Sequence, residues 1–183
     1  MIQEGNAMKT RIEKVTKENY QELYDFETRN RLFFELDLPP RPQGYNHFET
    51  FSGIMDELLK EQESGSYIMY LIRGNEGELV GRINLSLNVK TGEKSAEVGY
   101  RMDKEKLGRG YASKALRLIL EEAINIHHIT VVTAGTSSKN IASQHVLVKN
   151  GFSKVGEEKK VMKVNDQWAD GYLYSLRLKK LNP

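Results

Sequence analysis

The spacing of the apolar residues changes at a pair of glycines, and this change limits the possible folds more than any other feature of the sequence. Residues 96–102 alternate between apolar and polar or glycine positions, which is typical of a β-strand. From 109 to 125 apolar residues recur every three or four positions, which predicts an amphipathic α-helix. Gly108 and Gly110 lie between the two patterns. A strand therefore runs through a glycine-containing turn directly into a helix, as in α/β and α+β proteins.

Two further strands precede this unit and predict an antiparallel meander. Residues 82–89 alternate strictly, with aliphatic side chains on one face and polar side chains on the other, which predicts a half-buried strand. Residues 67–73 form another short apolar run. Turns containing glycine are expected at 74–77 and 91–93, and they would connect the three strands in order.

The remaining segments predict helices before the meander and a second mixed region after it. The pattern between 16 and 60 is helical, and the prolines within 38–42 predict a loop between two helices. No internal repeat or long linker interrupts the chain. We therefore expect residues 1–183 to form a single α/β (α+β) domain with helices on a mixed sheet. The later elements are expected as a strand at 129–133, a helix at 140–150 closed by Gly151, a hairpin at 156–168 turning at Asn165 and Asp166, and a strand at 172–179.

Composition excludes several classes of function. The chain has no cysteine, which rules out a disulfide scaffold, a thiolate nucleophile and a cysteine-ligated zinc site. His127, His128 and His145 lack a second ligand at metal spacing, and the net charge of +2 lacks the basic excess of nucleic-acid-binding proteins. No apolar run approaches the roughly 20 residues that cross a bilayer, and the first residues do not resemble a signal peptide. We expect a cytoplasmic protein without a nucleic acid, membrane or metal partner, and a disordered extension at 1–8 with Met8 as an alternative start.

The glycine-containing turn predicts an anion site. Gly108 and Gly110 let the backbone approach a ligand closely, and the first amides of the following helix have no partner within the helix. A pyrophosphate would fit there. The alternative is that the glycines only shape a tight connection. The segment is neither a Walker loop nor a dinucleotide fingerprint, because the further residues that those motifs require are missing.

Residues 107–112, Leu-Gly-Arg-Gly-Tyr-Ala, resemble the acetyl-coenzyme A (acetyl-CoA) loop of the GNAT acetyltransferases. That loop has Gln or Arg, two variable residues, Gly, a variable residue, and then Gly or Ala. Gly110 and Ala112 match the last two fixed positions. Leu107 departs from the polar first position, as is common in the branch that acetylates ribosomal-protein N-termini, the RimJ/RimL type.

A second segment, 140–152, is similar to the Asn-x-x-Ser motif ending in Gly-Phe that the same branch carries. With 96–100 and 170–176, the resemblance extends over roughly residues 65 to 180. It implies the GNAT fold, which has a mixed, mostly antiparallel sheet, helices on both faces, and two central parallel strands that splay apart. The pantetheine of the coenzyme would enter that gap and pair with the strand edge around residues 100–102.

The resemblance implies an N-acetyltransferase that moves an acetyl group from acetyl-CoA to an amine by direct attack. The acceptor expected for this branch is the α-amine of a protein N-terminus. Two alternatives stay open: acetylation of a small amine, such as a polyamine, an antibiotic or an amino acid, and a non-catalytic CoA-binding sensor. Glu35, Asp37 and Glu49 would favour a cationic small molecule if they faced the acceptor groove. Monomer and homodimer are both compatible with the sequence.

The resemblance also assigns site residues. Glu97 is expected as the base that removes the amine proton, commonly through water, and Ser143 as a hydrogen-bond donor to the coenzyme sulfur. Each has a structural alternative, as the polar residue of an alternating strand and as a helix-surface hydroxyl. The position where many GNAT enzymes carry a catalytic tyrosine is Leu147 here. Asn140 is expected both as a helix N-cap and as a coenzyme contact.

The coenzyme contacts are then expected at Tyr100, Arg101, Met102, Leu107, Gly108, Arg109, Gly110, Tyr111, Ala112, Asn140 and Ser143. Arg31, Phe33 and Phe34 resemble the segment that lines the acceptor groove, although adjacent aromatic residues are more often part of a core.

Overall fold

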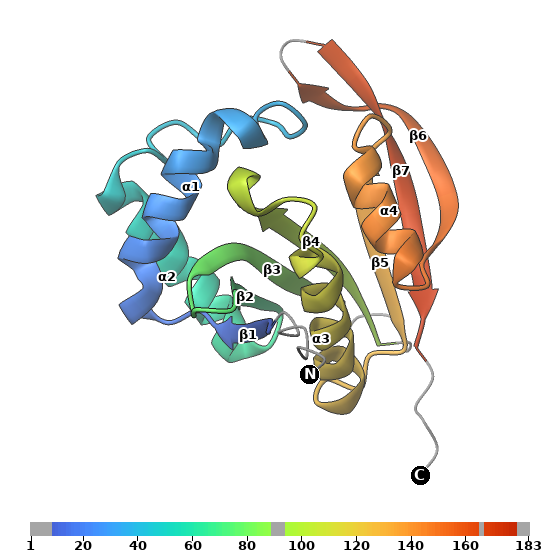
Figure 1. Cartoon of the computed structure of the whole chain (residues 1–183), viewed down its shortest axis with the longest axis horizontal. Helices are drawn as coiled ribbons and strands as arrows, with labels where there is room; N and C mark the ends of the chain where they lie inside the picture. Colours follow the sequence, from blue (N-terminus) through green and yellow to red (C-terminus); the bar gives the residue numbers. More distant parts are fainter. Residues whose placement is uncertain (1–8, 89–93, 165–166, 179–183) are drawn as a thin grey trace, which may run out of the picture.

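Seven strands in the described residues form one mixed sheet in the order β1-β2-β3-β4-β5-β7-β6 (Figure 1). The structure is a computed structural model, and it describes residues 9–88, 94–164 and 167–178. Its strands and helices are β1 (Arg11–Lys14), α1 (Tyr20–Phe34), α2 (Phe48–Ser64), β2 (Tyr67–Arg73), β3 (Leu79–Asn88), β4 (Ser95–Met102), α3 (Tyr111–Asn125), β5 (Val131–Ser137), α4 (Ile141–Lys149), β6 (Ser153–Val164) and β7 (Gln167–Arg177).

The predicted meander is confirmed, since β2, β3 and β4 pair antiparallel in sequence order. The turn after β2 needs glycine, because Gly77 has a positive φ of +86°. The sequence did not predict β1, whose four residues Arg-Ile-Glu-Lys pair antiparallel with β2. A single apolar residue in a four-residue edge strand leaves no periodicity to detect. The expected turn at 91–93, the turn residues Asn165 and Asp166, and the segment 1–8 lie outside the described residues.

Strands β4 and β5 are parallel neighbours that separate after a short ladder. They pair only from Ser95 with Val131 to Glu97 with Thr133, and beyond this point the two strands diverge (Figure 1). The expected splayed parallel strands are therefore confirmed. Strand β5 begins two residues later than predicted, because Ile129 is buried in the connection before it and donates its N–H to the carbonyl of Ala123. Its apolar side chain fits a strand pattern, but its backbone closes the end of α3.

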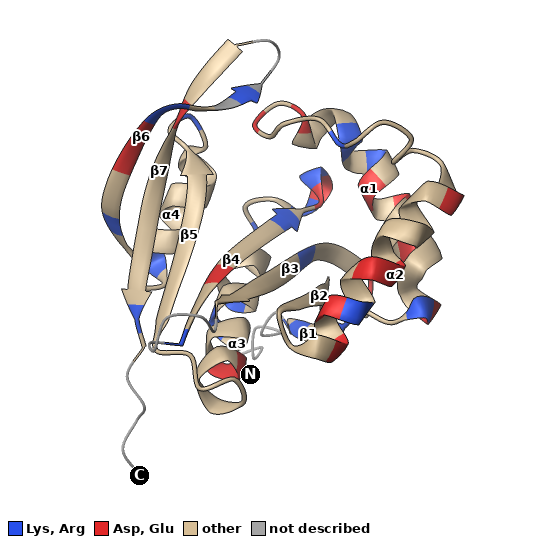
Figure 2. Ribbon diagram, turned by 180° about the vertical axis from the view of Figure 1, so that it is seen from behind, with Lys and Arg blue, Asp and Glu red and all other residues tan. Residues whose placement is uncertain are grey.

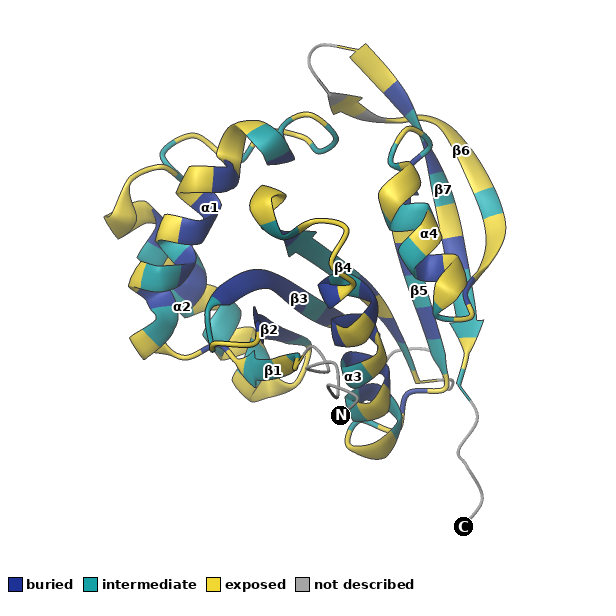
Figure 3. Cartoon of the chain, viewed as in Figure 1, coloured by how far each residue is buried: buried dark blue, intermediate teal, exposed yellow. Residues whose placement is uncertain are grey.

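Helices cover both faces of the sheet, as expected. Helices α1 and α2 pack on one face around Phe26, Phe51 and Leu71, and α3 and α4 pack on the other around Leu116 and Ile119 (Figure 3). Full burial of each such side chain stabilises the fold by about 1.5–3 kcal/mol. The two helical layers hold β4 in place. One face of β4 faces α1 and α2, and the other faces α3 and α4.

None of the helices in the described ranges combines the length and the apolar character that crossing a membrane would require.

Candidate active site

One backbone edge of β4 has no strand partner over most of its length in the described part of the chain. The other edge pairs with β3, and the N–H of Asp103 continues this ladder with a hydrogen bond of 2.9 Å to the carbonyl of a β3 residue. In an antiparallel pair, successive residues alternately direct their backbone groups toward and away from the partner strand. The N–H and C=O groups of Tyr100 and Met102 therefore point away from β3, into the gap beside β5. A ligand with amide groups can pair with this edge as an added strand would.

The loop after β4 presents free amides at the start of α3. Gly110 is the N-cap of the helix and has a φ of +80°, and Gly108 has a φ of +71°. Both conformations favour glycine. The first helical hydrogen bond is the 3.1 Å bond from the N–H of Lys114 to the carbonyl of Gly110. The amides of residues 111–113 precede it and, with the helix dipole, form an anion site. A Cβ built on Gly108 meets nothing within 4 Å, so the cradle is open. These residues fit a pyrophosphate.

The side chains of this loop divide into exposed and buried ones. Leu107 and Arg109 are exposed and can contact a ligand. Tyr111 is buried in the core under α3, so it is available to a ligand through its backbone amide. Ser113 is also buried and accepts a 2.9 Å hydrogen bond from the side-chain amide of Asn150, which ties the start of α3 to the end of α4.

Across the gap, the start of α4 meets Tyr100 of β4. The Tyr100 hydroxyl lies 2.9 Å from Ser143 Oγ and 3.3 Å from the Ser143 carbonyl. Asn140 caps the helix by accepting a 3.0 Å hydrogen bond from the N–H of Ser143, so its expected N-cap role is confirmed. Burial raises the pKa of Tyr100 to about 12, against a smaller opposite effect of its hydrogen bond with Ser143. The phenol is therefore protonated at neutral pH and bridges the gap between β4 and α4.

Glu97 lies where the parallel ladder ends. Its side chain is exposed and stands on the face of β4 opposite to that of Tyr100, next to Ser86 of β3. A Cβ built on Gly135 of β5 would lie 4.0 Å from Glu97 Oε1, so the carboxylate lies beside a position of β5 that has no side chain. Strand β5 itself has no charged residue (Figure 2). A carboxylate is thus open to solvent beside the mouth of the gap.

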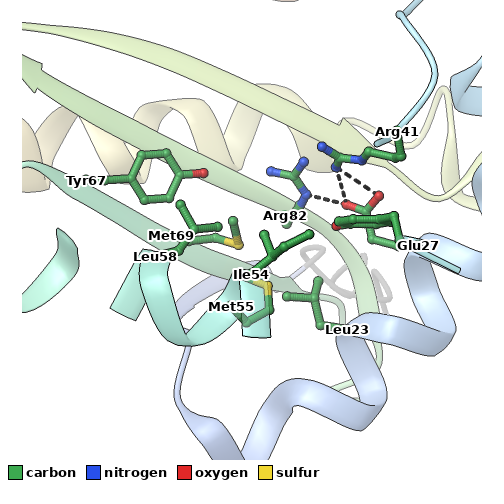
Figure 4. Close-up of a pocket in the computed structure, with 10 residues that line it drawn as sticks. Leu23, Glu27, Arg41, Ile54, Met55, Leu58, Tyr67, Met69 and Arg82 are labelled. Carbon is green, nitrogen blue, oxygen red and sulfur yellow. Dashed lines mark hydrogen bonds and ion pairs between the residues drawn. The ribbon is translucent and has the colours of Figure 1, made fainter. Parts of the chain in front are cut away.

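On the same face as Glu97, a buried cluster of charges lies under α1. Glu27 of α1 accepts hydrogen bonds of 2.6 Å from Arg82 Nε, 2.9 Å from Arg41 Nη2 and 3.4 Å from Arg101 Nη1 (Figure 4 shows the first two). Burial alone would raise the pKa of Glu27, but the charges of these three arginines outweigh burial and lower the pKa to about 2. Glu27 is therefore ionised at neutral pH.

Sequence reasoning missed Glu27, Arg41 and Arg82 as components of a site. Arg82 was expected on the polar face of a half-buried strand, yet it is buried, because α1 and α2 cover that face of β3. A usable signal existed in α1, where Glu27 lies four residues from Leu23 and seven from Phe34. This helical spacing puts a carboxylate on the apolar face, where an unpaired charge is too costly to bury.

Arg101, which was expected as a coenzyme contact, belongs to this cluster and lies on the face of β4 opposite to that of Tyr100. Its backbone pairs with Arg82, and its guanidinium lies over the ring of Phe34, 4.9 Å from the ring centroid. Phe34 is buried and Phe33 packs beside it, so both contribute to the core between α1 and α2. Arg31 is exposed, and its Nε lies 4.0 Å from Glu35 Oε1. Arg31 therefore neutralises Glu35, one of the three acidic residues that would favour a cationic acceptor.

Comparisons with known proteins give a family match and named relatives. The family model described as "Acetyltransferase (GNAT) domain" matches residues 10–153. The probable N-acetyltransferase YjcK of Bacillus subtilis is 28% identical over 167 residues, which cover 89% of this chain and 88% of that protein. The [ribosomal protein uS5]-alanine N-acetyltransferase of Escherichia coli is 25% identical over 157 residues, which cover 84% of this chain and 80% of that protein.

Solved structures match the fold closely at low sequence identity. The ribosomal-protein-S5-alanine acetyltransferase from Vibrio fischeri superposes with a TM-score of 0.87 at 21% identity and covers 95% of this chain and 96% of its own. The spermidine N-acetyltransferase from Vibrio cholerae, in complex with CoA and spermine, has a TM-score of 0.77 at 14% identity and covers 92% of this chain and 95% of its own. Proteins with a peptide acceptor and with a polyamine acceptor thus share this fold, which leaves the acceptor to be argued from the chain's own residues.

Proposed function

Because this chain belongs to the GNAT acetyltransferase family, we propose that its acetyl-CoA-dependent N-acetyltransferase activity acts on the α-amine of a protein N-terminus in the cytoplasm. The observation that carries the choice of acceptor is the charge on the acceptor side of β4. There, three arginines surround one glutamate on the same face as Glu97. This excess of positive charge disfavours a polyamine, which carries several positive charges of its own. The relative that acts on ribosomal protein uS5 supports the same choice.

The coenzyme is held by backbone groups in this proposal. The N–H and C=O groups of Tyr100 and Met102 pair with the pantetheine amides, and the loop 107–112 holds the pyrophosphate at the start of α3. The Arg109 side chain is exposed beside this loop and can screen phosphate charge. Asn140 and Ser143 contribute from α4, on the other side of the gap.

Acetyl transfer then proceeds by direct attack of the acceptor nitrogen on the thioester carbonyl. The nitrogen–carbon bond forms as the carbon–sulfur bond breaks, and Glu97 receives the amine proton through a water molecule. The chain has no cysteine to form a thioester intermediate, which is consistent with direct transfer.

The departing thiolate needs a hydrogen-bond donor, and Ser143 with Tyr100 can provide one. A serine hydroxyl is a weak acid, so Ser143 stabilises negative charge and does not transfer its proton freely. The Tyr100 hydroxyl, at 2.9 Å, orients the Ser143 hydroxyl and takes part of the charge. The pair would replace the tyrosine that many GNAT enzymes carry at the position of Leu147.

An acceptor screen tests the proposal. The purified protein is incubated with acetyl-CoA and peptides that begin with Ala or Ser, and release of free thiol is recorded. The same peptides with a blocked N-terminus are the control, and spermidine is the competing acceptor. Turnover of the free peptides alone supports the proposal. Turnover of spermidine alone would refute it in favour of a small-amine enzyme, and calorimetric binding of acetyl-CoA without thiol release from any acceptor would indicate a sensor.

A further inference from the structure

The buried charges beneath α1 do not balance. Arg41, Arg82 and Arg101 contribute three positive charges, and Glu27 is the carboxylate that all three contact. Burial and the positive charges of Arg82 and Arg41 lower the pKa of Arg101 to about 10, which remains far above neutral pH. The cluster therefore retains a net charge of about +2 in a largely buried position, a strong field for an anion.

The cluster also has more hydrogen-bond donors than its acceptors use. A guanidinium has five N–H donors. Arg41 contacts both Glu27 oxygens through Nη2 alone, and its Nε is buried without a hydrogen-bond partner. Arg101 reaches Glu27 only through Nη1, at 3.4 Å. A buried donor without a partner is unfavourable, and a carboxylate matches the planar guanidinium fork.

A pocket opens beside Arg41 and Arg82, and Arg101 lies outside its lining. It has a volume of about 70 Å³ and lies between α1, α2 and the strands β2 and β3. Figure 4 shows Glu27, Arg41 and Arg82 at one end, with the Tyr67 hydroxyl directed toward Arg82 and apolar side chains below. About 10–15 Å³ of such volume is enough to hold one water molecule. The pocket thus has room for several water-sized groups, such as a carboxylate with its methylene group.

The cluster is within reach of the reacting amine. Arg101 lies four residues from Glu97 on the same face of β4, which corresponds to about 13 Å at roughly 3.3 Å per residue. An extended peptide spans this distance in about four residues, at roughly 3.3–3.6 Å each. An acceptor with its amine beside Glu97 can therefore place a carboxylate from one of its next residues at the cluster.

From these observations, we propose that Arg41, Arg82 and Arg101 form a carboxylate-binding subsite that selects acceptors with an acidic group close to the acetylated amine. This inference rests on the proposed function for the location of the amine beside Glu97. Two sources share the required chemistry: an Asp or Glu side chain early in a peptide, and the terminal carboxylate of a short acceptor. In either case the bound carboxylate supplies the negative charge and the acceptors that the cluster lacks.

The test compares acceptors that differ only in the acid. One amidated peptide has Ala followed by three Asp, and its partner has Ala followed by three Asn. The Asn peptide with a free carboxyl terminus identifies the second source. The pair 11-aminoundecanoate and n-undecylamine makes the same comparison among small amines, because an extended chain of this length separates the amine from the acid by about 13 Å. Each is assayed with the wild type, Arg41→Gln and Arg101→Gln. Arg11→Gln is the matched control, because Arg11 is 65% exposed on the edge strand β1.

For the wild type, we expect a kcat/KM at least about tenfold higher for the acidic member of a pair, the effect of one charged hydrogen bond. Arg41→Gln and Arg101→Gln should reduce this ratio to within about twofold, and Arg11→Gln should preserve it. Unchanged calorimetric affinity for CoA would show that each variant is folded.

The outcomes separate the two proposals. Equal turnover of the Asp and Asn peptides would overturn the carboxylate subsite and leave N-terminal acetylation standing. Preferred turnover of 11-aminoundecanoate over n-undecylamine, with the preference lost in Arg41→Gln and no peptide turned over, would refute the N-terminal acceptor and support the subsite. If no acceptor turns over, calorimetry measures the affinity of the N-acetylated Asp and Asn peptides for the complex of the protein with CoA. Equal affinities of the two peptides would overturn the subsite.

Discussion

Replacing Glu27 by Gln tests whether one carboxylate holds the three arginines together. Glutamine keeps the shape of the side chain and removes its charge, so Arg41, Arg82 and Arg101 lose their shared counter-ion. Glu27 is only 4% exposed, so water screens this change very little. We expect the variant to fold with a clearly lower free energy of unfolding at neutral pH.

The magnitude follows from the pKa of Glu27. The surrounding charges lower it from 4.5 to about 2, against the opposing effect of burial, and each pKa unit corresponds to about 1.4 kcal/mol. The ionised carboxylate therefore contributes about 3 kcal/mol. Removing one partner of a buried ion pair costs about 3–5 kcal/mol in other proteins, which agrees with this value.

The sign of the pH dependence is also fixed. A carboxyl group whose pKa is lowered in the folded state stabilises the protein fully above its unfolded pKa, and this contribution is lost as the pH falls toward the folded pKa. The difference between wild type and Glu27→Gln should be about 3 kcal/mol at pH 7. It should shrink between pH 4.5 and pH 2. Other carboxylates titrate in both proteins and cancel in the difference.

Urea unfolding followed by far-ultraviolet circular dichroism at pH 7, 5 and 3 measures this difference. Glu57→Gln is the control, because Glu57 pairs with Lys60 on the exposed surface of α2 and should change stability little. A difference below about 1 kcal/mol at pH 7, or one that stays constant down to pH 3, would refute the assignment of Glu27 as the shared counter-ion.

Three further predictions concern the reaction and the coenzyme loop. Glu97→Gln should lower kcat/KM by about 10²–10⁴-fold at neutral pH without changing CoA affinity, and unchanged steady-state kinetics would remove Glu97 from the mechanism. Tyr100→Phe and Ser143→Ala should each lower kcat by about fivefold. The double variant should have a kcat close to that of each single variant, because the two hydroxyls act as one unit. Additive losses of kcat in a double-mutant cycle would contradict this pairing. Gly110→Ala, at a φ of +80°, should weaken CoA binding in calorimetry. Gly53→Ala, on the open surface of α2, should leave CoA binding unchanged and stabilise the fold by about 0.5–1 kcal/mol. If Gly53→Ala weakened CoA binding more than Gly110→Ala, the left-handed N-cap would be excluded as the reason for glycine at position 110.

The sequence determined the local elements because their signals are local. The strict alternation at 82–89 and the helical spacing at 109–125 identified β3 and α3, since each pattern reports which face of one element is apolar. The glycines at 108 and 110 likewise marked the turn between β4 and α3, because their backbone conformation is set within the turn itself. The resemblance of this turn to the GNAT loop then gave the family and the splayed strands.

Only the tertiary structure decided which charges meet. Glu27 is 55 residues from Arg82 and 74 from Arg101 in the sequence, and the register of β3 against β4 brings the two arginines side by side. The packing of α1 on that face then buries Arg82, which an isolated strand pattern places in solvent. The contact of Tyr100 with Ser143 depends in the same way on the position of α4 across the gap. Periodicity records how one element is divided between core and water, whereas the neighbours of a charge follow from strand register and helix packing, which no local pattern contains.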